Sequence, residues 1–255
     1  MQTILLTIKY NGKAYAGWQR QAGFDTIQER LEIACATLFG EHIAVHGAGR
    51  TDAGVHALGQ TAHVRIPRPF PLDEMPGALN GNLPRDIAVR DCRAVSLDFH
   101  SRFSARGKRY VYRFLNQSVR PVLLRDLFHW VRWPLDITRM RQGAAHLIGE
   151  HDFAAFASNP GYERTRGTVR HITQARIVGR PHGMDLVLQG SGFLYNMVRA
   201  IAGTLQDVGT GKIPPDQVLN ILSSKDRSQA GMTAPACGLY LLRVLYPSEA
   251  LEIAR

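Results

Sequence analysis

The stretch DTIQERLEIACATLFG, residues 25–40, decides the fold of the first half of the chain, because it places a helix between two strand-like segments. Asp25 or Thr26 can cap this helix and Gly40 can end it. Its apolar residues recur at the spacing of an amphipathic helix: Ile27, Leu31, Ala34 and Leu38. We therefore predict a helix that packs one apolar face against a sheet.

The segments around this helix have the alternation or apolar runs of strands. In the first half, strands are predicted over 3–10, 42–49, 59–67 and 86–95, with a weakly helical segment over 71–82. In the second half, strands are predicted over 107–116, 171–180, 184–190 and 238–246, and helices over 136–149, 193–209 and 214–224. We predict an α+β protein of two RRM-like or ferredoxin-like β-α-β-β-α-β halves, residues 1–105 and 106–255, each an antiparallel sheet backed by helices.

Composition indicates an ordinary globular protein. The 255 residues are 45% hydrophobic, which is enough to fill a sizeable core, and no apolar run approaches the roughly 20 residues of a membrane helix. Cys35, Cys92 and Cys237 are scattered without a CxxC pair, and none of the ten histidines forms an HExxH pair. We therefore expect a cytoplasmic protein with no signal peptide, no membrane segment and no metal site.

The charge of the chain is strongly positive. Lys and Arg together number 31 against 21 Asp and Glu, a net charge of +10. The basic residues cluster in SRFSARGKRYVYR (101–113) and YERTRGTVRH (162–171). An excess of this size favours a polyanionic partner, and nucleic acid is the first candidate. The alternative is that the charge only keeps the protein in solution.

The stretch HGAGRTDAGVHALGQ, residues 46–60, places Arg50 and Asp52 among four glycines. It contains no GxxxxGK[ST] motif, and Asp52 replaces the third glycine of GxGxxG, so a nucleotide loop is not indicated. One interpretation is a surface turn in which Arg50 and Asp52 pair with each other. The other is a catalytic loop, with Asp52 as a nucleophile kept ionised by a guanidinium and glycines that admit a substrate.

Two further features accompany this loop. Strand alternation in GKRYVYR puts Tyr110 and Tyr112 on one face, either as core residues or as a stacking surface for unpaired bases, and the basic surroundings favour stacking. Arg199 lies on a helix but off its apolar stripe, and it is either a solvated residue or a residue that acts at a site. That stripe consists of Leu194, Met197, Val198, Ile201, Leu205 and Val208.

Seven motifs in order then give a resemblance over nearly the whole chain. They are YNGKAYAGWQRQ (10–21), TIQERLE (26–32), NGNLPRDIAV (80–89), FHSRFSARGKRYVYR (99–113), GEHDFAAF (149–156), NMVRAIAGTL (196–205) and TAPACGLYL (233–241), together with GRTDAGVHALGQ. The set resembles the tRNA pseudouridine synthases that act on the anticodon stem and loop. The resemblance implies an isomerase that converts uridine to pseudouridine at tRNA positions 38, 39 and 40, without a cofactor, and a homodimer with its active-site cleft between the two halves.

The resemblance also implies roles for individual residues. Asp52 matches the nucleophile, and Arg50 matches the arginine that lines the site and handles the displaced RNA. Tyr110 matches the tyrosine that contacts the target base. Arg199 matches the arginine that pairs with the catalytic carboxylate, and Leu239 matches a leucine that packs by the base.

The chain departs from the family pattern at Ser101, where many members have Ala, and at Tyr195 and Asn196, where many have an aromatic residue and His. These differences bear on RNA contacts. Two other classes of function stay open: an RNA-binding module without activity, in which Asp52 would weaken binding to phosphates, and an Asp-dependent phosphate hydrolase, which would need a metal.

Overall fold

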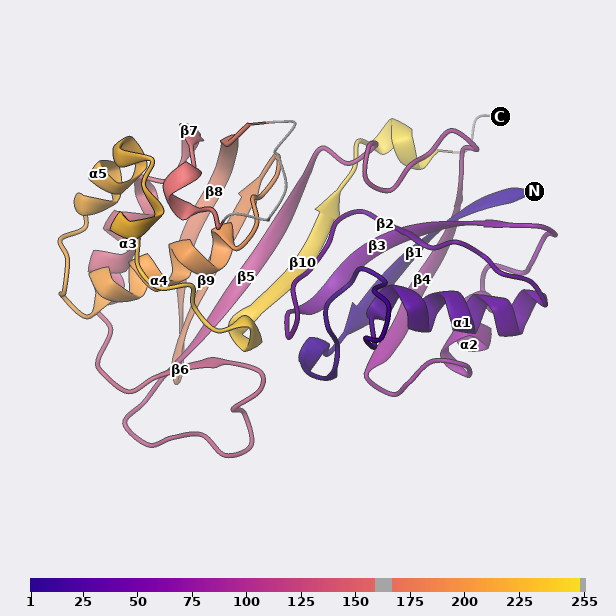
Figure 1. Cartoon of the computed structure of the whole chain (residues 1–255), viewed down its shortest axis with the longest axis horizontal. Coiled ribbons are helices and arrows are strands. Elements are labelled where there is room, and N and C mark those ends of the chain that lie inside the picture. Colours follow the sequence, from indigo (N-terminus) through magenta and orange to yellow (C-terminus); the bar gives the residue numbers. More distant parts are fainter. Residues whose placement is uncertain (159–166, 253–255) are drawn as a thin grey trace. The chain divides into compact units, whose positions relative to one another are not determined.

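The computed structural model describes residues 1–158 and 167–252, and these form two compact units (Figure 1). Unit 1 consists of Met1–Lys108 together with the described residues from Tyr240 onward, and unit 2 consists of the described residues of Arg109–Leu239. The last strand is predicted to belong to the second half. The structure groups most of that strand with unit 1, because its Tyr240 and Leu241 pair with His56 and Ala57.

Unit 1 contains a sheet in the order β4-β1-β3-β10, with β2 paired to β3. Its strands are β1 (Gln2–Tyr10), β2 (His46–Gly47), β3 (His56–Ile66), β4 (Ile87–Val95) and β10 (Leu239–Leu245). The strand β1 is antiparallel to β3 and to β4, whereas β10 is parallel to β3. The strand predicted over 42–49 is reduced to two residues, which pair with His63 and Ala62.

Two helices accompany this sheet, α1 (Ile27–Phe39) and α2 (Met75–Asn80), with a 3-10 turn η1 (Gly12–Ala14). Figure 1 shows α1 and α2 side by side, and α2 packs against β4. The predicted apolar face of α1 is confirmed except at Leu38, which is only half-buried. The residues of α1 that are buried are Ile27, Leu31, Glu32, Ala34, Cys35 and Phe39.

The ends of α1 follow the sequence in part. Gly40 ends the helix in the left-handed conformation, with φ of 79°, as a C-terminal glycine does. Thr26 occupies the N-cap position but makes no side-chain capping bond. The carboxylate of Asp25 forms an ion pair with Arg30, at 2.6 Å, one turn into the helix.

Unit 2 contains a sheet in the order β5-β9-β8-β7, with β6 parallel to β5. Its strands are β5 (Gly107–Asn116), which begins in unit 1, and β6 (His129–Val131), β7 (Gly149–Asp152), β8 (Val169–Arg180) and β9 (Gly183–Gly190). Its helices are α3 (Ile137–Ala145), α4 (Met197–Gly209) and α5 (Gln217–Ser224), which pack together on this sheet (Figure 1). Short 3-10 turns are η2 (Ala154–Phe156), η3 (Arg227–Gln229) and η4 (Ala236–Gly238) in unit 2 and η5 (Ser248–Leu251) in unit 1.

Most residues of the helix α4 are buried. All six residues of the predicted stripe are buried, and so are Ala200 and Ala202 on other faces of the helix. Within the described ranges, residues 1–158 and 167–252, no helix is both long and apolar enough to cross a membrane.

Candidate active site

The segment between β2 and β3, residues 48–55, carries Arg50 and, at the start of a tight turn over 52–55, Asp52. The carbonyl of Asp52 accepts a hydrogen bond from the amide of Val55 at 3.1 Å. Gly54, the third residue of this turn, has φ of 76°, a conformation that favours glycine over other residues. The turn therefore explains one glycine of the stretch, and it leaves Asp52 half-buried at its start.

Buried hydrogen bonds fix the backbone on both sides of Asp52. The hydroxyl groups of Tyr10 and Thr51 lie 2.7 Å apart, and both side chains are buried. The amide of Trp18 donates to the carbonyl of Thr51 at 3.0 Å, and the amide of Gly12 donates to Nδ1 of His56 at 3.1 Å. The Asp52 turn is thus clamped from β1 and from the segment that follows it, which is the rigidity a catalytic group needs.

Arg50 is exposed, and its side chain is held from the same segment. Its Nε donates to Oε1 of Gln19 at 3.1 Å. Gln19 lies next to Trp18, whose amide bonds the backbone of the Asp52 turn. The residues around position 18 therefore contact both the backbone of this turn and the side chain of Arg50.

A second cation lies beside this loop. The amine of Lys108 packs against Gly49, the residue that precedes Arg50. Burial lowers the pKa of Lys108 to about 8, and the positive charge of Arg102 adds to the effect. Lys108 and Arg102 both belong to the basic segment 101–113. Of the other basic segment, residues 162–166 lie outside the described residues.

Two hydrogen bonds within unit 2 hold the side chain of Arg199. Its Nε donates to the carbonyl of Ala234 at 2.7 Å, and its Nη1 donates to Oδ1 of Asn196 at 3.0 Å. Asn196 is the N-cap of α4 and has φ of 60°, a conformation that Asn tolerates better than most residues. Asn196 also donates to Ser158 at 3.0 Å. The residue that departs from the family pattern, Asn196, is therefore a hydrogen-bond partner of Arg199.

The tyrosines of β5 are not exposed. Tyr110 and Tyr112 are 8% and 0% exposed, so the prediction that both form an exposed stacking face is wrong, whereas a base contact of Tyr110 alone stays a prediction. Tyr112 is a core residue: its hydroxyl donates to the carbonyl of Pro235 at 2.8 Å, and its ring leaves no room for a side chain at Gly238. Tyr110 packs its ring edge-to-face with Phe193, with the centroids 5.0 Å apart. Alternation identified which residues share a face, but the covering of that face comes from elsewhere in the chain.

Two further residues of the sequence analysis are buried. Leu239 is the first residue of β10 and is 6% exposed. Ser101 is fully buried: its hydroxyl donates to the carbonyl of His46, and its amide donates to Nδ1 of His63 at 3.2 Å. The departure at Ser101 is therefore accommodated by hydrogen bonds inside unit 1.

Comparison with known proteins shows the family of the chain. The sequence profile of the tRNA pseudouridine synthase family matches residues 6–104 and 144–247. The chain is similar to proteins named tRNA pseudouridine synthase A. In Geobacter sp. (strain M21) the identity is 45% over 248 residues, 97% of this chain and 100% of the relative, and in Caldicellulosiruptor bescii it is 43% over 246 residues, 96% of this chain and 100% of the relative.

The chain belongs to the tRNA pseudouridine synthase family, a class of isomerases that act on tRNA. The stretches that match the family profile contain Arg50, Asp52, Arg199 and Leu239, whereas Tyr110 lies between them.

Gln19 and Asn196, which bond the two arginines, are not among the predicted site residues. The only signal for Gln19 was its place in the motif YNGKAYAGWQRQ.

Proposed function

We propose that this chain isomerises uridine to pseudouridine at positions 38, 39 and 40 in the anticodon stem and loop of tRNA, with Asp52 as the nucleophile. The observation that carries the proposal is the half-buried Asp52 on a turn clamped by buried hydrogen bonds, in a chain that belongs to this family. A carboxylate held in this way is available to react without a change of the surrounding backbone.

The reaction breaks the bond between N1 of uracil and C1′ of ribose, turns the base and forms a new bond from C5 to C1′. The hydrogen on C5 leaves as a proton, and no electrons are gained or lost. Asp52 acts on the substrate by attack at C1′, by addition at C6 or by assisting formation of a glycal. No cofactor enters these steps.

The other site residues have supporting roles in this proposal. The target nucleotide leaves the base stack at a cost of roughly a few kcal/mol, which contacts from Arg50 and the basic surface to phosphates offset. Arg199 counters the negative charge of the catalytic carboxylate, and its guanidinium is kept in place by Ala234 and Asn196. Tyr110 and Leu239 contact the base, and the enzyme works as a cytoplasmic homodimer.

Tritium release tests the central role of Asp52. Transfer RNA labelled at C5 of uridine loses tritium to water when pseudouridine forms. We expect Asp52→Asn and Asp52→Ala to abolish release while tRNA affinity stays within a few fold, because phosphate contacts supply most of the binding. Undiminished release by either variant would remove Asp52 from the mechanism. No release by the unmodified protein, together with tighter binding by Asp52→Asn, would point to an RNA-binding module.

A further inference from the structure

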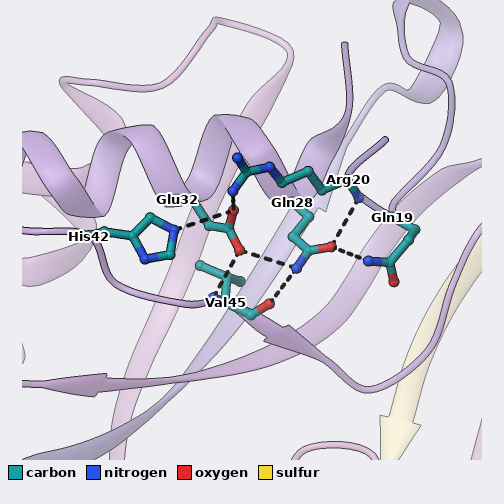
Figure 2. Close-up of polar contacts among 6 residues, drawn as sticks. All are labelled: Gln19, Arg20, Gln28, Glu32, His42 and Val45. Carbon is teal, nitrogen blue, oxygen red and sulfur yellow. Dashed lines mark hydrogen bonds and ion pairs between the residues drawn. The ribbon is translucent and has the colours of Figure 1, made fainter. Parts of the chain in front are cut away.

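A buried carboxylate on α1 is the starting point of a chain of hydrogen bonds that ends at Arg50. Glu32 is 6% exposed, and a buried charge is costly unless it is paired and hydrogen-bonded. Its Oε2 accepts from Nη1 of Arg20 at 3.2 Å, and its Oε1 accepts from Nε2 of Gln28 at 3.1 Å and from the amide of Val45 at 3.3 Å (Figure 2). An ionised carboxylate has no hydrogen to donate, so Glu32 requires donors on its neighbours.

This requirement sets the orientation of the next residue, Gln28. Its Nε2 donates to Glu32 and to the carbonyl of Val45, each at 3.1 Å, which uses both amide hydrogens. Its Oε1 therefore points the other way, and it accepts from the amide of Arg20 at 3.0 Å and from Nε2 of Gln19 at 2.9 Å (Figure 2). A flipped amide would place Oε1 of Gln28 against two acceptors.

The same logic sets the orientation of Gln19. Because its Nε2 donates to Gln28, its Oε1 is the atom presented to Arg50, and it accepts from Nε of Arg50 at 3.1 Å. The order of donors and acceptors thus runs in one direction from Glu32 through two amides to the guanidinium. The backbone follows the same path, since the amide of Gln28 bonds the carbonyl of Trp18 and the amide of Trp18 bonds the carbonyl of Thr51.

We propose that Gln19 and Gln28 are positioning residues for Arg50, with Glu32 fixing the direction of the hydrogen bonds between them. This inference rests on the proposed function, in which Arg50 contacts RNA. Holding Nε by Gln19 orients the guanidinium plane, so that the four hydrogens on its two terminal nitrogens face outward to bind oxygen atoms of the RNA. Ordering an exposed arginine before RNA arrives also lowers the entropy lost on binding.

A double-mutant cycle tests this inference. Gln19→Met keeps the length of the side chain and removes both hydrogen bonds. We expect it to lower kcat/KM for tritium release about tenfold, by misplacing a substrate contact. In an Arg50→Ala background the same change should alter kcat/KM by less than about twofold, since the residue through which Gln19 acts is gone. Gln28→Met should behave in the same way.

The control is Gln21→Met, in the same segment. Gln21 is exposed, and its side chain bonds only the carbonyls of Ala16 and Gln19 among the described residues. It should leave kcat/KM unchanged in both backgrounds. Thermal unfolding of every variant shows whether a loss of activity reflects a loss of folded protein.

The outcomes separate this inference from the proposed function. Suppose that the unmodified protein releases tritium. If Gln19→Met then costs no activity, or costs as much in the Arg50→Ala background as in the unmodified protein, the positioning role is wrong and the function stands. If no protein releases tritium, the function fails. The cycle is then evaluated from tRNA affinity in the same four proteins, where additive effects of Gln19→Met and Arg50→Ala overturn the positioning role and non-additive effects support it.

Discussion

The amine of Lys108 lies so close to Gly49 that a Cβ on Gly49 would be 2.8 Å from Nζ and 2.9 Å from Cε. Gly49 directly precedes Arg50, so this cation lies at the start of the loop that carries the candidate nucleophile. The pKa of Lys108 is lowered to about 8, by burial and by Arg102. Lys108 is therefore a charge beside the site that is present at neutral pH and lost on moderate alkalinisation.

The first prediction concerns the pH dependence of tRNA binding. The ammonium of Lys108 is charged below about pH 8, so it favours RNA binding at pH 7 and contributes little at pH 9. We expect the affinity to fall severalfold between these values, and Lys108→Met to be weaker at pH 7 with a smaller fall. In Lys108→Met, the slope of the logarithm of affinity against the logarithm of salt concentration should also be reduced by about one, which corresponds to one lost phosphate contact. Filter binding at constant ionic strength measures both effects.

The control for Lys108 is Lys212→Met, which removes an exposed lysine that pairs with Asp207. It should retain the fall in affinity between pH 7 and pH 9. Equal pH profiles for Lys108→Met and the unmodified protein would contradict a role of Lys108 in binding RNA.

The second prediction concerns the contact between Gly17 and the Asp52 turn. Gly17 has φ of 100°, and a Cβ there would lie 2.6 Å from the carbonyl oxygen of Thr51, a backbone atom that cannot move without shifting Asp52. Gly23 also has a positive φ, of 78°, but a Cβ there meets nothing within 4 Å. Gly17→Ala should therefore lower activity far more than Gly23→Ala, although both strain the backbone by roughly 1 kcal/mol or more.

Steady-state tritium release and thermal unfolding of these two glycine variants separate the two effects. Strain alone lowers the unfolding temperature of both proteins. Displacement of the Asp52 turn lowers kcat in Gly17→Ala only. Similar values of kcat in the two variants would show that the contact with Thr51 does not position the turn.

The fold was predictable where local pattern decides it. The strand over 107–116 and the stripe of α4 are confirmed, because ten or more residues carry a clear periodicity. The strands β6 and β7 were missed, since three or four residues are too few to show alternation. The place of β10 depends on pairing with His56, far away in the chain, and no local pattern shows such a partner.

The candidate site was predictable in its residue types and not in its supports. Arg50 and Asp52 stand out because charge on a glycine-rich loop is unusual. The hydrogen bond from Arg50 to Gln19 joins residues 31 positions apart, and it depends on how two segments fold against each other. The sequence offers polar amides in many places and does not show which of them meet.

The third prediction concerns stability in acid. His63 is 2% exposed, and burial lowers its pKa to about 4, with His46, His100 and Arg65 adding to the effect. Its Nδ1 accepts from the amide of Ser101, so a proton there would face a donor. As pH falls from about 6.5 to about 4, the unfolded chain takes up a proton that the folded chain does not. Stability should therefore fall, by at most about 1.4 kcal/mol per pH unit for this group.

Urea unfolding at pH 5 and pH 7.5 tests the role of His63. His63→Asn keeps an acceptor near the position of Nδ1 and removes the titration. It should make the two unfolding free energies more alike than in the unmodified protein. His182→Asn, at an exposed histidine, is the matched control and should keep the original difference. A difference unchanged by His63→Asn would assign the acid sensitivity to other groups.

The last prediction concerns Arg199. Its guanidinium bonds Ala234 through Nε and Asn196 through Nη1, and the remaining donors are fixed in direction by the planar group. A lysine carries all its donor hydrogens on a single nitrogen, so it cannot reproduce the separate positions of Nε and Nη1 in these two bonds. If Arg199 pairs with the catalytic carboxylate as proposed, Arg199→Lys should reduce kcat by about tenfold or more and change tRNA affinity much less. Equal losses of turnover and of affinity in Arg199→Lys would mean that Arg199 only binds RNA.

Asn196→Gly tests the support of Arg199 alone, since glycine keeps the positive φ of Asn196 and removes the bond to Nη1. We expect a smaller loss of kcat in Asn196→Gly than in Arg199→Lys.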